Sequence, residues 1–404
     1  MKHITRLNKK ISSLLLAIQL ISLVLLPGIA HALSTGSIQS WNSTTVMPSD
    51  LHSASSVVYN GYVYEIGGIE GNSSAVNTVY YAPLNADGTV GTWNTTTALP
   101  NVLYGATSVA TNGYVYEIGG DNFSGVVNTV YYAPLNSNGT VGNWQSTSSL
   151  PIALFYATSV TYNGYVYEIG GIEGNSSAVN TVYYAPLNAN GTVGNWTSTT
   201  VLPSGLENST SVVYNGYVYE IGGIEGNSSA VNTVYYAPLN SNGTVGNWTA
   251  TTVLPNALYN ATSVATNGYV YEIGGIGNTT GTTNTVYYAP FNSNGTIGTW
   301  NTTTALPDTI YYATSVVYNG YVYEIGGVGN TGTVNTVYYA GLTPSPSNNT
   351  NTQTSSSSPT TSSPNTPDTG FGEPTHISPI VTLISISSIV SISLGLTLIY
   401  KKTY

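Results

Sequence analysis

Short apolar and hydroxyl-rich runs alternate with turn-forming pairs from residue 37 to residue 342. In the first complete unit, a run at residues 56–59 leads into Asn60 and Gly61, and a second run occupies residues 62–66. Asn-Gly between two such runs is the strongest short-range signal for a β-hairpin, because its type I′ turn needs positive φ at both central residues. The pattern therefore predicts two antiparallel strands joined by a tight turn.

Two further strands complete the unit. The third is predicted at residues 78–84, where Tyr, Val and Thr are concentrated, and a turn follows at residues 85–88. The fourth is predicted to run through Val90 and Trp93 to Pro100. Each unit is therefore expected to form four short strands and no helix.

The phrase Asn-Gly-Tyr-Val-Tyr-Glu-Ile-Gly-Gly occurs six times. It begins at Asn60, Asn112, Asn163, Asn215, Asn267 and Asn319. Its closing glycines are Gly67 and Gly68, Gly119 and Gly120, Gly170 and Gly171, Gly222 and Gly223, Gly274 and Gly275, and Gly326 and Gly327. The spacing is 52 residues with one step of 51, and a fixed period of this length indicates a repeat architecture.

Each unit resembles the kelch repeat: a hydrophobic strand ends in Gly-Gly, a tyrosine follows at Tyr80 or Tyr81, and a tryptophan follows at Trp93. The tryptophans of the chain are Trp41, Trp93, Trp144, Trp196, Trp248 and Trp300. The resemblance covers nearly all of residues 37–342. It implies an all-β fold, a six-bladed kelch-type β-propeller with four-stranded antiparallel blades.

The position of the tryptophans predicts how such a ring closes. Trp41 precedes the first Gly-Gly pair, whereas no tryptophan follows the sixth pair. The last blade therefore lacks its outermost strand. We expect residues 37–47, an N-terminal strand, to supply it and so to cover edges that otherwise invite aggregation.

Charge is distributed very unevenly along the chain. All six Lys and Arg residues lie at the two ends, while residues 33–342 carry fourteen of the sixteen carboxylates and one histidine, His52, a formal charge of −14. Nucleic acid is excluded as a partner because phosphate binding needs Lys and Arg. Cysteine is absent, so the chain has no disulfide and no thiolate metal site, and no cofactor is expected.

The two ends predict an extracellular, tethered protein. Residues 1–32 have the basic, apolar and small-residue regions of a signal peptide, with cleavage expected before Leu33; an uncleaved anchor is the alternative. Residues 33–342 form the predicted propeller, and residues 343–375, rich in Ser, Thr, Pro and Asn, form a flexible stalk. Within 376–404, an uncharged run of 21 residues precedes Lys401 and Lys402, as in a transmembrane helix with a cytoplasmic basic tail.

A short motif precedes the apolar run. Residues 366–370 read Thr-Pro-Asp-Thr-Gly, which resembles the Leu-Pro-x-Thr-Gly cell-wall sorting signal of Gram-positive surface proteins. Thr366 stands where that signal has leucine, and the gap to the apolar run is longer than usual. The resemblance implies a sortase that attaches the protein to the cell wall; without processing, the helix anchors it in the membrane. Either outcome places the protein on the extracellular face.

Candidate ligand-binding residues lie in two sets of loops. Loops after the second and fourth strands of a blade are expected on one face, and the loop after strand four varies at one position, four residues past each proline. Together with neighbouring residues this position gives the candidates His52, Tyr104, Asp121, Phe155, Tyr156, Glu207, Tyr259, Tyr311 and Tyr312. Aromatic and polar groups on one face suit a glycan or a protein ligand. The alternative is that these aromatics pack between blades.

Six glutamates recur at one position of the repeat: Glu65, Glu117, Glu168, Glu220, Glu272 and Glu324. Buried carboxylates without a basic partner are expected to have raised pKa values or strong hydrogen-bond donors. One interpretation is a cation site; the other is that each Glu accepts from a nearby hydroxyl or backbone N–H. The turn at residues 85–88 resembles a calcium loop only faintly, because its counterparts lack the carboxylate.

Enzymatic interpretations fit the residues poorly. Kelch-type oxidases that resemble galactose oxidase need two His and a Tyr-Cys crosslink, and sialidase-like propellers need an arginine cluster; residues 33–342 contain one His and no Cys or Arg. A Glu and a Tyr leave glycosyl chemistry as a remote alternative. We therefore expect a non-enzymatic cell-surface adhesion or binding protein. A structural coat or spacer protein is the second hypothesis, and a carbohydrate-active enzyme the third.

Overall fold

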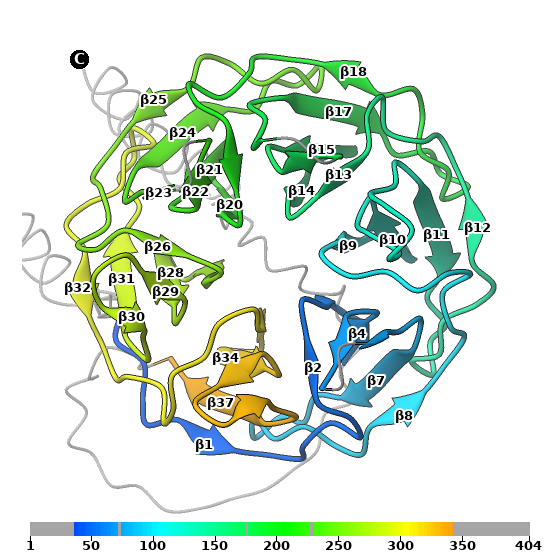
Figure 1. Ribbon diagram of the computed structural model, residues 1–404, viewed down its shortest axis with the longest axis horizontal. Helices are drawn as coiled ribbons and strands as arrows, with labels where there is room; N and C mark the ends of the chain where they lie inside the picture. Colours follow the sequence, from blue (N-terminus) through cyan, green and yellow to red (C-terminus); the bar gives the residue numbers. More distant parts are fainter. Residues whose placement is uncertain (1–35, 72–73, 175–176, 227–228, 343–404) are drawn as a thin grey trace, which may run out of the picture. The chain divides into compact units, whose positions relative to one another are not determined.

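The structure, a computed structural model, describes residues 36–71, 74–174, 177–226 and 229–342. Within these ranges the regular elements are β-strands, and six four-stranded antiparallel sheets lie around a central opening (Figure 1). We number them sheets 1 to 6 in chain order. The prediction of an all-β fold built from four-stranded antiparallel sheets is confirmed.

The strands of each sheet are given from the central opening outward. Sheet 1 contains β3 (Ser55–Tyr59), β4 (Tyr62–Ile66), β7 (Val79–Pro83) and β8 (Asn94–Thr95). Sheet 2 contains β9 (Thr107–Thr111), β10 (Tyr114–Ile118), β11 (Val130–Pro134) and β12 (Gln145–Ser146). Sheet 3 contains β14 (Thr158–Tyr162), β15 (Tyr165–Ile169), β17 (Val182–Pro186) and β18 (Thr197–Ser198).

The second half of the ring follows the same order. Sheet 4 contains β20 (Thr210–Tyr214), β21 (Tyr217–Ile221), β24 (Val234–Pro238) and β25 (Thr249–Ala250). Sheet 5 contains β27 (Thr262–Thr266), β28 (Tyr269–Ile273), β31 (Val286–Pro290) and β32 (Asn301–Thr302). Sheet 6 contains β33 (Thr314–Tyr318), β34 (Tyr321–Ile325), β37 (Val337–Gly341) and β1 (Asn42–Ser43).

The two inner strands of each sheet are joined by the predicted Asn-Gly turn. In sheet 1, Asn60 has φ 53° and Gly61 has φ 82°, and the strands pair from Tyr59 opposite Tyr62. The other five Asn-Gly pairs also have positive φ at both residues. The local sequence alone therefore specifies the type I′ hairpin, because Asn tolerates and Gly favours this conformation.

The hydrophobic core is divided into six clusters, one between each pair of neighbouring sheets. Val57 and Tyr64 of sheet 1, for example, pack in the same cluster as Tyr131 and Ala133 of sheet 2. The second strand of each sheet is covered on both faces, so four of its five residues are buried. Stability therefore depends on contacts between sheets, as in other repeat proteins.

The outermost strand of sheet 6 comes from the N-terminal side of the described chain. In β1, Asn42 and Ser43 pair antiparallel with Tyr339 and Tyr338 of β37. Trp41 is 8% exposed and its indole N–H donates to the Thr304 carbonyl of sheet 5 at 3.0 Å. The equivalent bonds elsewhere are Trp93 to Thr45, Trp144 to Thr97, Trp196 to Ser148, Trp248 to Thr200 and Trp300 to Thr252. Trp41 therefore makes the same type of hydrogen bond as its five counterparts and is buried like Trp93 and Trp300.

The fourth strands are shorter than the sequence predicts, at two residues each. In sheet 1 the flanking residues bond to neighbouring sheets instead of extending β8. Trp93 donates to Thr45, and the Thr97 hydroxyl donates to the Val141 carbonyl of sheet 2 at 2.7 Å. The residues that flank β8 therefore connect sheet 1 to its two neighbouring sheets and do not lengthen the strand.

The Gly-Gly pairs lie where one sheet meets the next. The Gly68 N–H donates to the Leu103 carbonyl at 2.8 Å, and Gly67 has φ 61°. A Cβ atom on Gly67 would lie 2.5 Å from that carbonyl oxygen. Only glycine fits because the position needs both positive φ and close backbone contact.

Several predictions concern residues that the structure does not describe. The predicted signal peptide (1–32), stalk and sorting motif (343–375) and transmembrane segment (376–404) lie outside the described ranges. Within the described ranges, the chain has no helix with the length and apolar character to cross a membrane.

Candidate functional site

The two sets of variable loops pair with each other on one face, which we call the loop face. The residue at the variable position pairs with the residue that follows Gly-Gly: His52 in β2 (Leu51–His52) with Ile69 in β5 (Ile69–Glu70). The other pairs are Tyr104 with Asp121, Phe155 with Ile172, Glu207 with Ile224, Tyr259 with Ile276, and Tyr311 with Val328. The expectation that these loops share a face therefore agrees with the observed register.

Small sheets of two or three strands carry four of these pairs, whereas Tyr104 with Asp121 and Tyr311 with Val328 pair as isolated bridges. The small sheets comprise β2, β5 and β6 (Ser74–Ala75); β13 (Leu154–Phe155) and β16 (Ile172–Glu173); β19 (Leu206–Glu207), β22 (Ile224–Glu225) and β23 (Ser229–Ala230). The remaining strands are β26 (Leu258–Tyr259), β29 (Ile276–Gly277) and β30 (Gly281–Thr282), with β35 (Val328–Gly329) and β36 (Gly332–Thr333). Their hydrogen bonds hold the candidate residues in fixed positions around the opening.

Six residues directly after the variable positions form a cycle of backbone hydrogen bonds, which we call the mouth ring. Each N–H donates to the carbonyl of the equivalent residue in the preceding repeat. The bonds, donor first, are Ser53 to Tyr312, Gly105 to Ser53, Tyr156 to Gly105, Asn208 to Tyr156, Asn260 to Asn208, and Tyr312 to Asn260, with N···O distances of 2.8 to 3.1 Å. The series returns to its first residue, so the inner edge of the loop face is a continuous ring.

All six mouth-ring residues have positive φ, between 51° and 57°. Asn208 and Asn260 tolerate this conformation and Gly105 prefers it, whereas for a bulky tyrosine it is a genuine outlier. Tyr156 and Tyr312 nevertheless adopt it, with φ 51° and 55°. Such strained residues cluster at functional sites, where the surrounding structure holds them in place.

Tyr156 of sheet 3 and Tyr312 of sheet 6 lie on opposite sides of the ring and stack across the opening. Their ring centroids are 5.6 Å apart with an interplanar angle of 29°. Gly105 makes room for Tyr156, because a Cβ atom there would lie 2.9 Å from the Tyr156 ring. Burial raises the pKa of both tyrosines, so both phenols are neutral near pH 7.

Further rings surround this pair. Tyr104 contacts Tyr156 at 6.5 Å, Phe155 contacts it at 4.7 Å, and His52 contacts Tyr312 at 6.0 Å. Tyr311 contacts Tyr312 at 5.5 Å, and Phe123 contacts Tyr104 at 5.2 Å. We call His52, Tyr104, Phe123, Phe155, Tyr156, Tyr311 and Tyr312 the aromatic cluster.

The structure brings most of the candidate residues together. The nine predicted residues are partly exposed, neither fully buried between sheets nor fully exposed. Asp121 joins the group through Tyr104, whose pKa is raised by burial and by the Asp121 carboxylate. Glu207 and Tyr259 lie at the equivalent positions of the following two repeats.

Sequence reasoning did not single out four mouth-ring residues, Ser53, Gly105, Asn208 and Asn260, or Phe123, which is 58% exposed. The alignment of the repeats contained the signal for the ring. Where the second repeat has glycine, the third and sixth have tyrosine, and this position directly follows the variable one. Only the structure shows that these six residues meet around one opening.

The mouth ring borders a cavity of about 110 Å³, which we call the mouth cavity. Its polar lining includes Ser53, Tyr156, Asn208, Ser209, Asn260 and Tyr312, and Gly105 with alanines from five of the six repeats complete it. Asn260 is 7% exposed and its Oδ1 atom has no hydrogen-bond partner. A buried acceptor of this kind is unusual in folded proteins.

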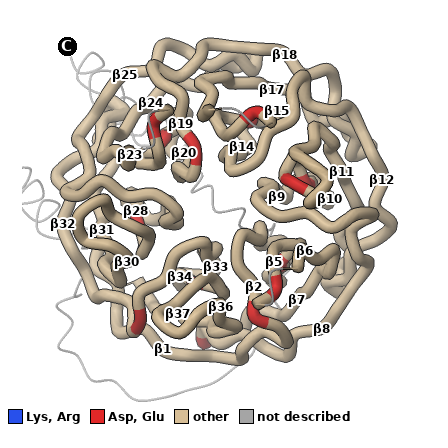
Figure 2. Tube along the Cα trace, in the orientation of Figure 1, with Lys and Arg blue, Asp and Glu red and all other residues tan. Residues whose placement is uncertain are grey.

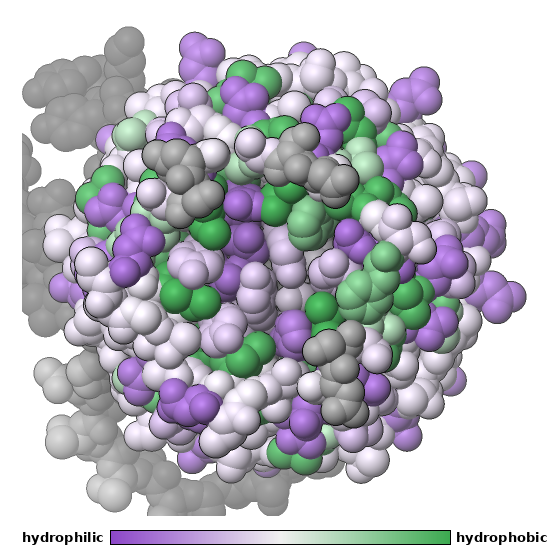
Figure 3. Space-filling view, in the orientation of Figure 1, coloured by the Kyte–Doolittle hydropathy of each residue, from purple (hydrophilic) through white to green (hydrophobic). Residues whose placement is uncertain are grey.

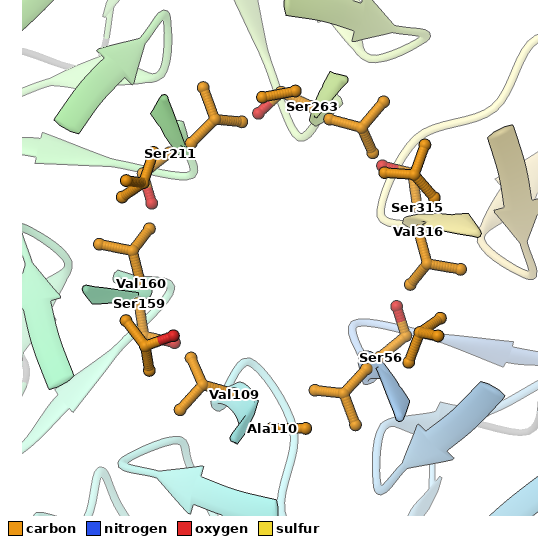
Figure 4. A pocket seen from close by; sticks show the side chains of 17 residues that line it. Ser56, Val109, Ala110, Ser159, Val160, Ser211, Ser263, Ser315 and Val316 are labelled. Carbon is orange, nitrogen blue, oxygen red and sulfur yellow. The ribbon is translucent and has the colours of Figure 1, made fainter. Parts of the chain in front are cut away.

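The central channel continues beside the innermost strands and has a volume of about 190 Å³. Figure 4 shows serine and valine side chains from successive sheets around it, among them Ser56, Ser159, Val160 and Ser315. None of the described residues that line it is charged. The channel therefore offers hydroxyl and apolar contacts but no ionisable group for acid–base chemistry.

The six repeated glutamates lie between neighbouring sheets, and each accepts a hydrogen bond from a hydroxyl of the preceding sheet. The pairs, donor first, are Ser55 to Glu117, Thr107 to Glu168, Thr158 to Glu220, Thr210 to Glu272, Thr262 to Glu324, and Thr314 to Glu65. Burial raises the pKa of all six carboxyl groups. Each carboxyl group thus has a hydroxyl donor, as the second of the two interpretations expects, although Oε1 of Glu324 has no hydrogen-bond partner.

The described ranges contain neither a basic Lys or Arg side chain nor a cluster of metal ligands. Figure 2 shows Asp and Glu in several sheets and no Lys or Arg within the part of the chain that is described. In the same part, no group of three or more His, Cys, Asp or Glu is close enough to hold a metal ion. At the turn of residues 85–88, Asp87 accepts from the Thr89 N–H and hydroxyl, as in an ordinary turn.

Comparison with known proteins supports a kelch-repeat protein. No protein-family model matches the chain. Over 229 residues, the chain is 28% identical to Kelch-like protein 23 of Mus musculus and 27% identical to Kelch-like protein 23 of Homo sapiens. Each alignment covers 55% of this chain and 36% of the relative, so the chain spans little more than a third of the curated relatives that it matches.

A solved structure also matches. The "Structure of YjhT" superposes with a TM-score of 0.60 at 16% identity, covering 73% of this chain and 95% of that chain. At this identity the match concerns the fold alone.

Proposed function

We propose that the chain is a binding protein: a six-bladed kelch β-propeller, closed by the pairing of β1 with β37, whose loop face recognises a protein or glycan ligand. Three series of contacts support the closed ring. The mouth-ring hydrogen bonds and the hydroxyl-to-glutamate bonds each include a contact between the first and last repeats, and Trp41 of the N-terminal segment bonds to Thr304 of sheet 5. A rigid ring of this kind presents loops at fixed positions.

The observation that carries the proposal is the aromatic cluster. Most of each repeat is the same as the next, so the positions that differ stand out. The variable and mouth-ring positions differ between repeats and gather partly exposed aromatic side chains on one face. Aromatic residues are enriched at protein interfaces, and their planes also stack on sugar rings.

Cellular location belongs to the same proposal. A signal peptide at 1–32 and an anchor at 376–404, or sortase processing at 366–370, place the loop face outside the cell. A surface-attached protein with a rigid binding face fits adhesion to a glycan or to another protein. The near-identity of the repeats favours a second function, a structural coat or spacer, which needs no specific ligand.

An array experiment separates these functions. The full chain, purified in mild detergent, is applied to arrays of glycans and peptides, together with the variants Tyr104→Ala and Tyr311→Ala. Selective binding that both variants lose supports recognition by the loop face. The matched control is Tyr235→Ala, a partly buried tyrosine of β24 on an outer strand, which should bind normally. No selective binding on either array favours the coat, and turnover of a bound glycan favours an enzyme.

A further inference from the structure

The mouth cavity contains an acceptor that the folded chain does not satisfy. Asn260 belongs to the mouth ring and is one of the residues that line this cavity; it is 7% exposed, and its buried Oδ1 atom has no hydrogen-bond partner. Glu207, which directly precedes Asn208 in the chain, also has a buried oxygen, Oε2, without a hydrogen-bond partner. An unpaired acceptor on a residue that lines a cavity favours a ligand that brings hydrogen-bond donors.

Every formal charge near the mouth is negative. Asp121 lies beside Tyr104, and Glu207 follows Leu206 in β19. His52 adds no positive charge near pH 7, because burial lowers the pKa of its imidazole. Figure 2 shows no Lys or Arg in the described ranges that could neutralise these groups. The field at the mouth therefore attracts cations and repels anions.

Aromatic rings add a second attraction of the same sign. Tyr156 and Tyr312 border the mouth cavity, and Tyr104 contacts Tyr156. The face of an aromatic ring is negative, so a cation within about 6 Å of its centroid is stabilised, most strongly where water is excluded. The aromatic rings, the unpaired oxygens and the negative local field therefore all favour a cationic group that carries hydrogen-bond donors.

The cavity is small. Its volume of about 110 Å³ is well below the roughly 300–1,000 Å³ of pockets that enclose a whole small ligand. It accommodates the head group of a larger ligand whose remaining part lies on the loop face. Figure 3 shows hydrophilic and hydrophobic side chains interspersed on the surface around the opening.

We propose that the mouth cavity binds the cationic end of a lysine or arginine side chain from a partner protein. In this arrangement, N–H donors of the ammonium or guanidinium group reach Asn260 Oδ1, while Tyr156 and Tyr312 provide the cation–π contacts. The inference rests on the proposed function, since it specifies the kind of ligand that the loop face takes. It favours a protein ligand over a neutral glycan.

Capped amino acids test the chemistry directly. Isothermal titration of the full chain uses N-acetyl-lysine amide and N-acetyl-arginine amide, with N-acetyl-norleucine amide and N-acetyl-citrulline amide as neutral counterparts. We expect the cations to bind roughly tenfold more tightly than the neutral compounds, and their affinity to fall as NaCl rises from about 50 to about 500 mM. Equal affinities for charged and neutral compounds, or no binding by either, would overturn the proposal.

A small free cation is the alternative source of the same chemistry. Tetramethylammonium has the charge but neither a stem nor N–H donors for Asn260. We expect it to bind several-fold more weakly than capped lysine. If it binds more tightly than both capped amino acids, the site takes a free quaternary cation, and the assignment to a partner side chain is wrong.

Variants separate the cavity from the rest of the loop face. Tyr312→Leu keeps an apolar side chain but removes the π-face, and should weaken binding of capped lysine roughly tenfold. Asn260→Asp keeps a residue type that tolerates positive φ and places a carboxylate in the cavity, and should strengthen binding several-fold. Tyr235→Leu, on an outer strand, should have no effect.

The outcomes distinguish failure of this inference from failure of the proposed function. If the arrays show binding that depends on Tyr104 and Tyr311, but neither Tyr312→Leu nor Asn260→Asp changes the affinity for capped lysine, the cationic ligand is wrong and loop-face recognition stands. If the arrays show no binding that depends on the loop face, the proposed function fails. Strengthened binding by Asn260→Asp cannot result from misfolding, so this variant supports the inference even if Tyr312→Leu is unstable.

Discussion

The hydroxyl of Thr314 donates to the carboxyl group of Glu65 at 3.1 Å, although the two residues are 249 positions apart in the chain. This bond joins the first strand of sheet 6 to the second strand of sheet 1. It has the same residue types and geometry as Thr210 with Glu272, which joins two sheets that are consecutive in the chain. The contact between the first and last repeats is therefore built like the contacts inside the series.

Thr314→Val and Thr210→Val provide a matched pair for this contact. Each substitution keeps the shape of the side chain but removes the hydroxyl donor of a buried carboxyl group, which costs about 1–3 kcal/mol of unfolding free energy. We expect urea denaturation to give similar losses for both variants. A normal loss for Thr210→Val with no loss for Thr314→Val would contradict the closed ring in solution.

Trp41→Ala tests the strand from the N-terminal side. Trp41 and Trp93 are 8% and 6% exposed, and each donates to a carbonyl of a neighbouring sheet. Truncation of a buried tryptophan costs about 3–5 kcal/mol. Trp41→Ala should therefore destabilise the protein as much as Trp93→Ala when thermal unfolding is measured by circular dichroism. Unchanged unfolding of Trp41→Ala alone would mean that β1 is not part of the stable fold.

The buried glutamates predict a stability that decreases as pH rises. Burial raises the pKa of Glu220 from its ordinary 4.5 to about 8, so the folded state holds a proton that the unfolded state releases. The stabilisation is complete below about pH 4.5 and is lost through about pH 8, at up to about 1.4 kcal/mol per pH unit for this carboxyl group.

Glu220→Gln removes the titrating group but keeps an oxygen that accepts from Thr158. We expect its unfolding free energy, measured in urea at pH 5, 6, 7 and 8, to fall less steeply with pH than that of the natural protein. Glu173→Gln, at an exposed position of β16, is the control and should leave the slope unchanged. Identical slopes for all three proteins would show that Glu220 is ionised in the folded state.

Substitution of two glycines distinguishes the cost of backbone strain from the cost of a steric clash. Gly119 and Gly164 both have positive φ, 65° and 79°, but a Cβ atom on Gly119 would lie 2.4 Å from the Leu154 carbonyl oxygen and one on Gly164 would meet nothing within 4 Å. Gly164→Ala should cost about 1–2 kcal/mol, and Gly119→Ala at least about 1 kcal/mol more. Equal losses in urea denaturation would show that the carbonyl moves away and that this contact is not restrictive.

The sequence by itself determined the local elements. Asn60 and Gly61 specify a type I′ hairpin through their own φ preferences, and the spacing of the Gly-Gly pairs indicates repeated units. The sequence also identified most candidate residues, because a position that varies among near-identical repeats, such as Tyr104 or Tyr311, is visible in their alignment. The turn depends on residues that are adjacent in the chain. The repeat spacing and the variable position can be identified by comparing the repeats, without knowing how they pack.

Only the tertiary structure decided how the repeats meet. The φ of Tyr156 and Tyr312, their stacking across the opening and the unpaired Asn260 oxygen arise where residues about 50 to 260 positions apart are held together by the mouth ring. The donor of each glutamate was also undetermined, because a repeated hydroxyl and a repeated carboxylate do not reveal which neighbouring sheet each side chain faces. Contacts between sheets depend on the angle at which the sheets pack, and no local preference encodes that angle.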